Sequence, residues 1–307
     1  MAESIQLTQK LAVGNTLGEG VIWDHRQEIV YWTDIQQSTL FSWKFGDLQA
    51  KQYMCPERLG CFGLTPNLDW LICGFESGFA FFNPHTGKIN WIQKVETEYS
   101  HTRLNDGRVD RQGRFWAGSM MQDEGADESR ARASLYRLEH NHQVTKVIEQ
   151  IKVSNGLCWS PNGDTLYFAD SPTQTIRQAK MNTETGDIGQ LTQFAKTDSH
   201  AYPDGSCVDN QGCIWNAQWA SNTVKRYSPD GELLLTLDVP CKQPSCVAFG
   251  GPDLQHLFVT SARIGLSEKL LDEQPSNGNL FVYHTPYTGL PESICLTPFS
   301  TSIETNK

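Results

Sequence analysis

A weak repeat of 40 to 52 residues constrains this chain more than any other feature of its sequence. Six strand-like cores each close on a small residue, at positions 33, 73, 117, 169, 216 and 260. Short strands that recur with such a period, separated by turn signals, are typical of a β-propeller. The sequence therefore predicts an all-β fold, a six-bladed β-propeller.

Turn chemistry between the cores supports this prediction. Asn-Gly and Asp-Gly steps, as at residues 160–163 and 228–231, indicate hairpins, because glycine adopts positive φ without a steric cost. Residues 5–13 form a lone strand-like segment ahead of the first repeat. We expect it to pair with the last blade through residues 280–283 and close the ring, which removes exposed strand edges. One domain over residues 1–307 is expected.

The overall charge of the chain limits the kinds of molecule that it is expected to bind. The 307 residues carry a net charge of −10 and have a pI near 5.3, which argues against nucleic acid or an anionic membrane surface as the main partner. The first residues contain no signal-peptide pattern, and no window approaches 18 apolar residues without charge. These features lead us to expect a cytoplasmic protein, as a monomer or small homo-oligomer.

The nine cysteines are interpreted as small, mostly buried, reduced side chains. No C-x-x-C pair or Cys/His cluster supports a zinc site, while one disulfide stays open at this point.

Two insertions interrupt the period. Residues 122–133 are polar and rich in charge, and residues 263–278 include a stretch at 266–271 that predicts a short helix. Insertions on one face of a repeat fold often form its binding face, although surface decoration is an equal alternative.

The first residue of each repeat is unusually polar. Glu19 precedes Asp24 by five residues, and the same step separates Asn105 from Asp110 and Asp204 from Asp209. These residues and Asn155 therefore occupy one place in four blades, at the entry of the innermost strand, where side chains point toward the central channel. The six repeats begin at Glu19, Cys61, Asn105, Asn155, Asp204 and Ser245.

A ring of carboxylate and amide oxygens predicts a site for a hard divalent cation such as Ca²⁺, Mg²⁺ or Mn²⁺. Taken singly, Asn-Gly and Asp-Gly are turn residues. Four such positions at one register, one of them the glutamate Glu19 that turn chemistry does not explain, favour a site. Three protein ligands would leave positions for water and substrate, as in catalytic metal centres.

Several stretches of the chain carry a family resemblance. The sequence resembles the SMP-30/gluconolactonase/regucalcin-like family of six-bladed propellers over nearly its whole length. The matching stretches are LGEGVIWD (17–24), RLNDGRVDRQGRFWAGSM (103–120), SNGLCWSPNGDTLYFAD (154–170), YPDGSCVD (202–209) and GLSEKLLDEQPSNGNLF (265–281).

The resemblance implies a metal-dependent lactonase that opens a sugar-derived aldonolactone, such as a gluconolactone or arabinonolactone. It implies that one divalent cation (Ca²⁺, Mn²⁺, Mg²⁺ or Zn²⁺) is held by Glu19, Asn155 and Asp204, with Asp204 also the candidate general base. Arg103 and Asn105 would contact the hydroxyls or ring oxygen of the lactone.

The chain departs from the family pattern after residue 120. Mammalian-type members have an acidic pair there, one member of which reaches the substrate, whereas this chain reads Met-Gln-Asp at 121–123. Asp123 would substitute with a shorter reach, so the substrate does not transfer from the family.

Nearby aromatic residues carry different expectations. Tyr202, next to the metal motif, is evenly balanced between a pocket and a structural role. Trp23 and Trp159 share one repeat position and are expected in the core.

Two other functions compete with a lactonase. The same ligands would serve a non-catalytic, calcium-binding regulatory propeller of the regucalcin type. A scaffold propeller that binds peptides is a weaker alternative, because the axis is polar and rich in ligand side chains.

Overall fold

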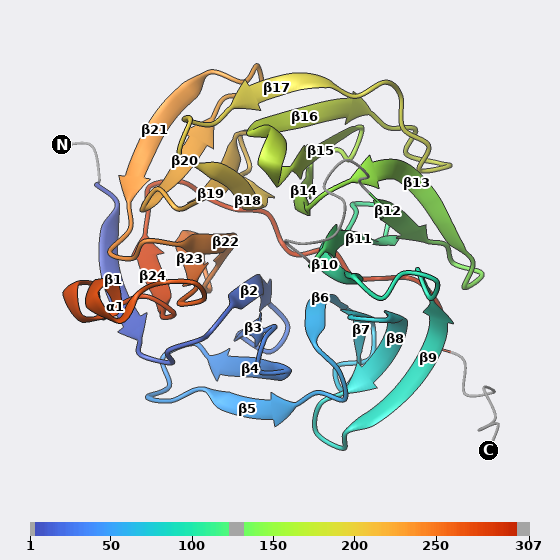
Figure 1. Cartoon of the computed structure of the whole chain (residues 1–307), viewed down its shortest axis with the longest axis horizontal. Coiled ribbons are helices and arrows are strands. Elements are labelled where there is room, and N and C mark those ends of the chain that lie inside the picture. The colour runs from blue at the N-terminus through green and yellow to red at the C-terminus, as the bar shows by residue number, and fades with distance from the viewer. Residues whose placement is uncertain (1–3, 123–131, 300–307) are drawn as a thin grey trace.

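Six four-stranded antiparallel sheets surround a central axis in the computed structural model, which describes residues 4–122 and 132–299 (Figure 1). The six-bladed β-propeller predicted from the repeat is confirmed. Each blade runs from the axis outward in chain order, except the last, whose outermost strand comes from the amino-terminal segment.

The first three blades cover the first half of the chain. They consist of β2 (Gly18–Asp24), β3 (Ile29–Asp34), β4 (Thr39–Lys44) and β5 (Lys51–Met54); β6 (Leu59–Leu64), β7 (Leu71–Phe75), β8 (Gly78–Asn83) and β9 (Lys88–Lys94); and β10 (Thr102–Val109), β11 (Phe115–Met121), β12 (Ala133–Leu138) and β13 (Val144–Ile151).

The other three blades follow in the same order. They consist of β14 (Ser154–Trp159), β15 (Thr165–Asp170), β16 (Thr175–Lys180) and β17 (Thr192–Lys196); β18 (Tyr202–Val208), β19 (Ile214–Trp219), β20 (Thr223–Tyr227) and β21 (Leu233–Asp238); and β22 (Pro244–Gly250), β23 (His256–Ser261), β24 (Leu280–His284) and β1 (Gln6–Leu11). A short 3-10 helix, η1 (Ser171–Thr173), follows β15.

The amino-terminal strand closes the ring. β1 pairs antiparallel with β24, with Gln6 opposite His284 and Leu11 opposite Leu280. The predicted pairing with the final blade is therefore confirmed, and it covers the strand edge that the last blade would otherwise expose.

The inner strands share one irregularity near their first residues. A β-bulge or register shift lies between Glu19 and Ile22 in β2 and between Asn155 and Cys158 in β14. The other four inner strands shift at the corresponding place. Such bulges bend a strand and re-aim its side chains, which is why they gather next to active sites.

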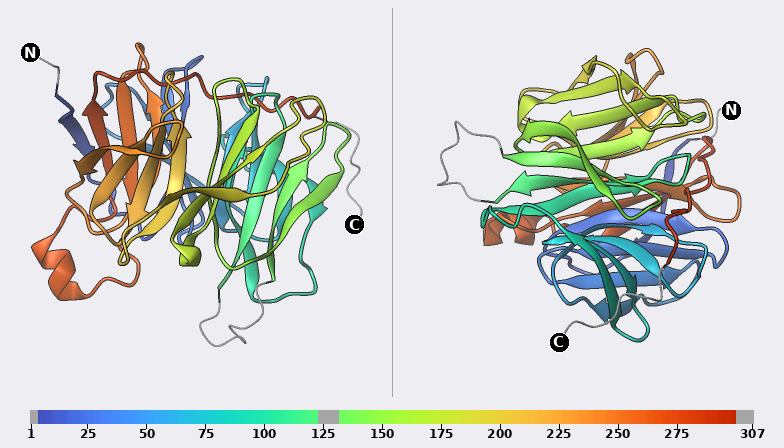
Figure 2. Two further views of the ribbon diagram at one scale, coloured as in Figure 1. Left: turned by 90° about the horizontal axis from the view of Figure 1, so that it is seen from above. Right: turned by 90° about the vertical axis from the view of Figure 1, so that its right-hand side faces the viewer.

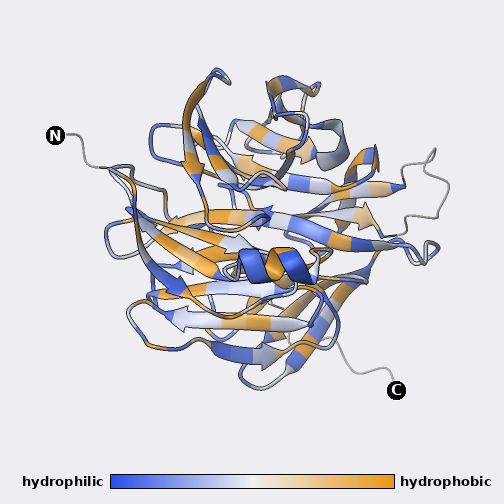
Figure 3. Ribbon diagram, turned by 60° about the vertical axis from the view of Figure 1, so that its left-hand side comes forward, coloured by the Kyte–Doolittle hydropathy of each residue, from blue (hydrophilic) through white to orange (hydrophobic). Residues whose placement is uncertain are grey.

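Aromatic side chains fill the spaces between blades. Trp23 and Trp159 are almost fully buried, as their shared repeat position predicts, and Trp23 stacks on Phe258 of the neighbouring blade. All nine cysteines are free and buried, so the disulfide that the sequence left open does not form. Hydrophobic and hydrophilic residues are interspersed along the blades (Figure 3).

Two segments lie on opposite faces of the disc-shaped propeller. The chain after β24 crosses the face opposite α1 (Glu268–Glu273), as the edge-on view shows (Figure 2). The predicted helix at 266–271 exists but begins later, because Ser267 caps it by accepting a hydrogen bond from the Leu270 amide. Among the described residues, no helix is long and apolar enough to cross a membrane.

Candidate functional site

A cavity of about 500 Å³ opens where the inner strands begin. We call this the open end of the channel. Five of the six site residues predicted from the sequence line it together: Glu19, Arg103, Asn105, Asn155 and Asp204. The sixth, Asp123, lies outside the described residues, so its predicted role remains a prediction.

Glu19 and Asp204 face one another across the cavity floor from β2 and β18. Both are almost fully buried, and their carboxyl groups share a hydrogen bond. Burial and the nearby charge of Asp106 raise the pKa of Glu19 to about 8. Burial, with the charges of Glu19 and Asp106, also holds the pKa of Asp204 well above its usual range. Two adjacent buried carboxylates repel each other, so the pair favours a bound proton or cation.

Hydrogen bonds fix the two amides on the same floor. Asn155 donates through Nδ2 to the hydroxyl of Ser171 at 2.9 Å, while its Oδ1 accepts from Asn105 Nδ2 at 3.1 Å. Ser171, from η1, donates in turn to the carbonyl of Pro203 at 2.7 Å. The Asn155 amide is thereby held between Ser171 and Asn105, in the same cavity lining as the two carboxylates.

Arg103 is the cation of the cavity floor. Its Nη1 donates to Asn105 Oδ1 at 2.8 Å and to the Leu104 carbonyl at 3.0 Å. Burial, and then the charge of nearby Arg58, lowers its pKa to about 10, so it stays protonated at neutral pH. Asn105 therefore links the guanidinium of Arg103 to Asn155.

Asp106 was not predicted as part of the site. It is buried, its charge acts on both Glu19 and Asp204, and its Oδ2 accepts from the Leu157 amide at 2.9 Å. It occupies the repeat place of Gly20 and Gly156, which both adopt positive φ. An acidic residue where other blades have glycine was a signal available in the sequence.

The rim of the cavity also contains residues that the repeat does not mark. Tyr202, for which the sequence favoured neither a pocket nor a structural role, lines the cavity and is partly exposed. Ile264 and Gln122 belong to the two insertions, so both insertions reach this rim. Further rim residues are Gln36, Arg58 and Trp219.

The floor suits a hard cation on the basis of its donors. Among the described residues, no three His, Cys, Asp or Glu side chains form a metal cluster. The floor instead combines the Glu19 and Asp204 carboxylates with the Asn155 amide oxygen, an oxygen-only set that fits Ca²⁺, Mg²⁺ or Mn²⁺. A cation would also relieve the repulsion between the two buried carboxylates.

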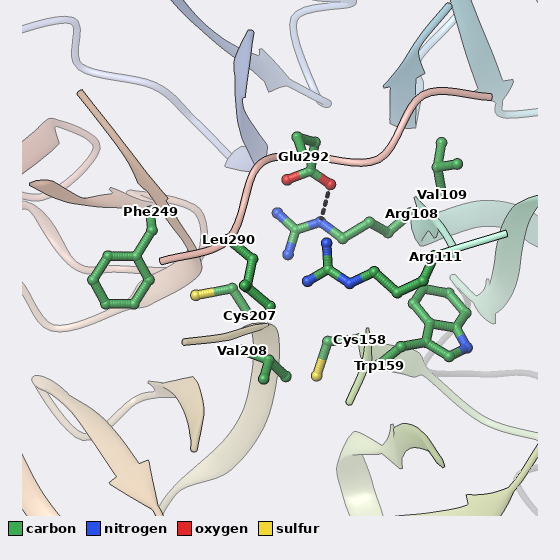
Figure 4. A pocket seen from close by; sticks show the side chains of 10 residues that line it. All are labelled: Arg108, Val109, Arg111, Cys158, Trp159, Cys207, Val208, Phe249, Leu290 and Glu292. Atoms are coloured by element: carbon green, nitrogen blue, oxygen red, sulfur yellow. Dashed lines mark ion pairs between the residues drawn. The ribbon is translucent and has the colours of Figure 1, made fainter. Parts of the chain in front are cut away.

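The opposite end of the channel is almost filled, and we call it the closed end. It contains a cavity of only about 30 Å³, with Arg108 and Arg111 beside Glu292 (Figure 4). Arg108 Nε pairs with Glu292 at 3.2 Å, and its two other nitrogens donate to the carbonyls of Ser206 and Val21. Arg111 donates to the Pro291 carbonyl at 3.0 Å, so the segment after β24 seals this end.

The chain belongs to the family described as SMP-30/Gluconolactonase/LRE-like region, whose sequence model matches residues 17–263. The resemblance inferred from the motifs is thereby confirmed, and the matched region includes all six predicted site residues.

Curated relatives and a solved structure support this membership. The chain is 39% identical to L-arabinolactonase of Azospirillum brasilense, over 90% of this chain and 91% of that protein. It is 34% identical to 6-deoxy-6-sulfogluconolactonase of Pseudomonas putida, over 91% and 95% of the two chains. A crystal structure of a calcium-binding protein, regucalcin, from Agrobacterium tumefaciens superposes with a TM-score of 0.88 at 27% identity, covering 94% and 97% of the two chains.

Proposed function

We propose that this protein is a metal-dependent lactonase that hydrolyses the ring ester of a sugar-derived aldonolactone to the aldonic acid. The observation that supports it most is the oxygen-donor set of one cavity, which Glu19, Asn155 and Asp204 line together with Arg103. The two curated relatives with lactonase names agree with this class of substrate.

The proposed cation is held by Glu19, Asn155 and Asp204. When bound, it supplies the positive charge that stabilises a lactone carbonyl oxygen as negative charge develops on it. Ca²⁺, Mn²⁺, Mg²⁺ and Zn²⁺ are the candidates.

The chain's own residues bind the lactone and move the proton. Asp204 acts as general base and accepts a proton from the attacking water. Arg103 donates N–H groups to the hydroxyls or ring oxygen of the lactone, and Asn105 holds that guanidinium in place while contacting the substrate. Burial of these groups strengthens their interactions, because water screens them poorly there. Asp123 is proposed as a further substrate contact.

A panel assay tests the proposal. Protein stripped with EDTA is mixed with individual aldonolactones and Ca²⁺, Mn²⁺, Mg²⁺ or Zn²⁺, and acid release is followed with a pH indicator. Turnover that requires a cation and is lost in Glu19→Gln supports the proposal. Cation binding without turnover of any lactone would instead favour a calcium-binding regulatory protein, in line with the name of the regucalcin neighbour.

A further inference from the structure

One arginine on the rim of the open end is held in place from behind by a carboxylate. Arg58 lines the cavity, whereas Glu76 does not. Arg58 Nε and Nη2 donate to the two carboxylate oxygens of Glu76 at 2.9 and 2.6 Å. This two-point geometry fixes the plane of the guanidinium.

The backbone places this pair with little freedom. Arg58 precedes β6 and Glu76 follows β7, and the Glu76 amide donates to the Arg58 carbonyl at 2.7 Å. The Glu76 carbonyl accepts from the Leu104 amide at 3.1 Å, in the next blade. The pair is therefore fixed to the strand that contains Arg103. Arg58 lies close enough to Arg103 for its charge to lower the pKa of that residue.

The two arginines differ in what surrounds them. Arg103 is buried on the floor, and among the described residues no carboxylate forms an ion pair with it. Arg58 is about one-quarter exposed and fully paired with Glu76. No described residue accepts a hydrogen bond from Arg58 Nη1, which leaves this nitrogen as a donor on the rim.

We propose that Arg58 determines specificity by donating to the exocyclic arm of the lactone, and that Glu76 is a positioning residue that restricts this arm to neutral hydroxyl groups. The inference rests on the proposed lactonase function. A lactone whose carbonyl lies at Glu19 and Asp204, with its ring oxygens at Arg103, extends along the same wall toward Arg58.

Charge explains the preference for hydroxyl groups. Glu76 neutralises Arg58, so a carboxylate on the arm gains little attraction and is repelled by Glu76. A hydroxyl group needs only a donor, and a carboxylate-fixed guanidinium supplies one at a low entropic cost. A site built to hydrogen-bond a hydroxyl group discriminates strongly when that partner is removed.

Two matched substrates test this inference. Glucono-1,4-lactone and glucaro-1,4-lactone differ only at the end of the arm, which is a hydroxymethyl group in the first and a carboxylate in the second. Erythrono-1,4-lactone has no arm. For each variant we would measure kcat/KM with all three lactones, with the cation saturating, together with the thermal midpoint of unfolding.

The expected result is a change in selectivity. In Arg58→Gln the ratio of kcat/KM for gluconolactone over erythronolactone falls about tenfold, mainly through KM. In Glu76→Gln the ratio of kcat/KM for glucarolactone over gluconolactone rises about tenfold, because a net positive charge remains on the rim.

Glu57→Gln is the matched control. Glu57 is adjacent in sequence and accepts from Ser77 and Lys94, but it does not line the cavity. Glu57→Gln removes the same negative charge as Glu76→Gln and should leave both kcat/KM ratios unchanged. Equal shifts in Glu57→Gln and Glu76→Gln, or an equal loss on all three lactones in Arg58→Gln, would overturn the inference. Absence of turnover of every lactone by the wild-type protein would instead overturn the proposed function.

Discussion

The two ends of the central channel are built from the same six inner strands, yet their polar groups are satisfied in opposite ways. At the closed end, Asp209 is fully buried and accepts four hydrogen bonds, two from backbone amides, one from Trp215 and one from Arg226. At the open end, the buried Glu19 and Asp204 share a hydrogen bond with one another, and each accepts one from the amide of the glycine that follows it, but among the described residues neither has a cationic partner like Arg226. At the closed end the protein itself supplies the partners of the buried carboxylate, whereas the open end is the candidate ligand site.

This difference shows how to interpret the five-residue step in the sequence. Asp204 lies in β18 and Asp209 directly follows that strand, and the two are the same residue type and are both buried. Residue type alone does not distinguish the roles of the two aspartates, whereas their hydrogen-bond partners do. An aspartate that caps a turn and holds a tryptophan stabilises the fold, whereas a buried carboxylate pair without such partners is a candidate for ligand binding.

The largest expected effect is on catalysis at the open end. Asp204→Asn should lower lactonase kcat/KM by about 10³-fold, because it removes both the proposed base and a cation ligand. The thermal midpoint of the cation-free protein should not fall, since the substitution also removes charge repulsion. The pH-indicator assay measures the rate, and a variant with near wild-type turnover would remove Asp204 from the mechanism.

At the closed end the same substitution should act on stability. Asp209→Asn should lower the free energy of unfolding by about 3 kcal/mol, because Arg226 is left buried without its carboxylate. Activity below the unfolding temperature should stay within about twofold. Urea unfolding measures this difference, with Asp230→Asn in an exposed turn of the same blade as the control. Activity loss without a loss of stability in Asp209→Asn would contradict the comparison.

Cation binding should stabilise the open end in a pH-dependent way. The folded-state pKa of Glu19, about 8, lies above the usual value of 4.5 for this side chain, so the cation-free folded protein keeps a proton that the unfolded chain releases. Its stability should therefore fall as the pH rises from about 4.5 to about 8.

Ca²⁺ or Mn²⁺ at 100 times its dissociation constant at pH 8 should add about 2.7 kcal/mol of stability at that pH. The same cation concentration should add less near pH 5, because protons compete for the ligands. Glu19→Gln should weaken both effects. Thermal unfolding with EDTA and with added cation tests this, and an equal cation effect at both pH values would argue against these ligands.

The smallest expected effect concerns the segment that seals the closed end. Glu292→Gln removes the carboxylate beside Arg108, but Arg108 keeps its bonds to the Ser206 and Val21 carbonyls. Stability should therefore fall by only about 1 kcal/mol, without a change in lactonase activity. Urea unfolding measures the loss, and a change in kcat/KM would mean that the two ends are coupled.

Much of the fold could be predicted because each blade repeats the same local chemistry. Strand cores and Asn-Gly turns indicated six blades, and the lone segment at residues 5–13 indicated how the ring closes. The shared register brought Glu19, Asn155 and Asp204 to one cavity, since equivalent positions of a propeller meet at its axis.

Features that depend on tertiary contacts rather than on the repeat were not predictable. The ion pair of Arg58 with Glu76 exists only because the end of one hairpin holds both residues beside β10. The segment after β24 has no strand pattern, and its contacts with Arg108 and Arg111 come from its path across the disc. The place of Asp106 in the repeat was an available signal, but its burial near Glu19 and Asp204 is known only from the structure.

The most direct test of the account is the number of divalent cations retained per chain after gel filtration, measured in the wild-type protein, Asp204→Asn and Asp209→Asn. We expect one retained cation in the wild-type protein and in folded Asp209→Asn, and none in Asp204→Asn. Retention by Asp204→Asn, or loss from folded Asp209→Asn, would contradict the assignment of ligand binding to the open end alone.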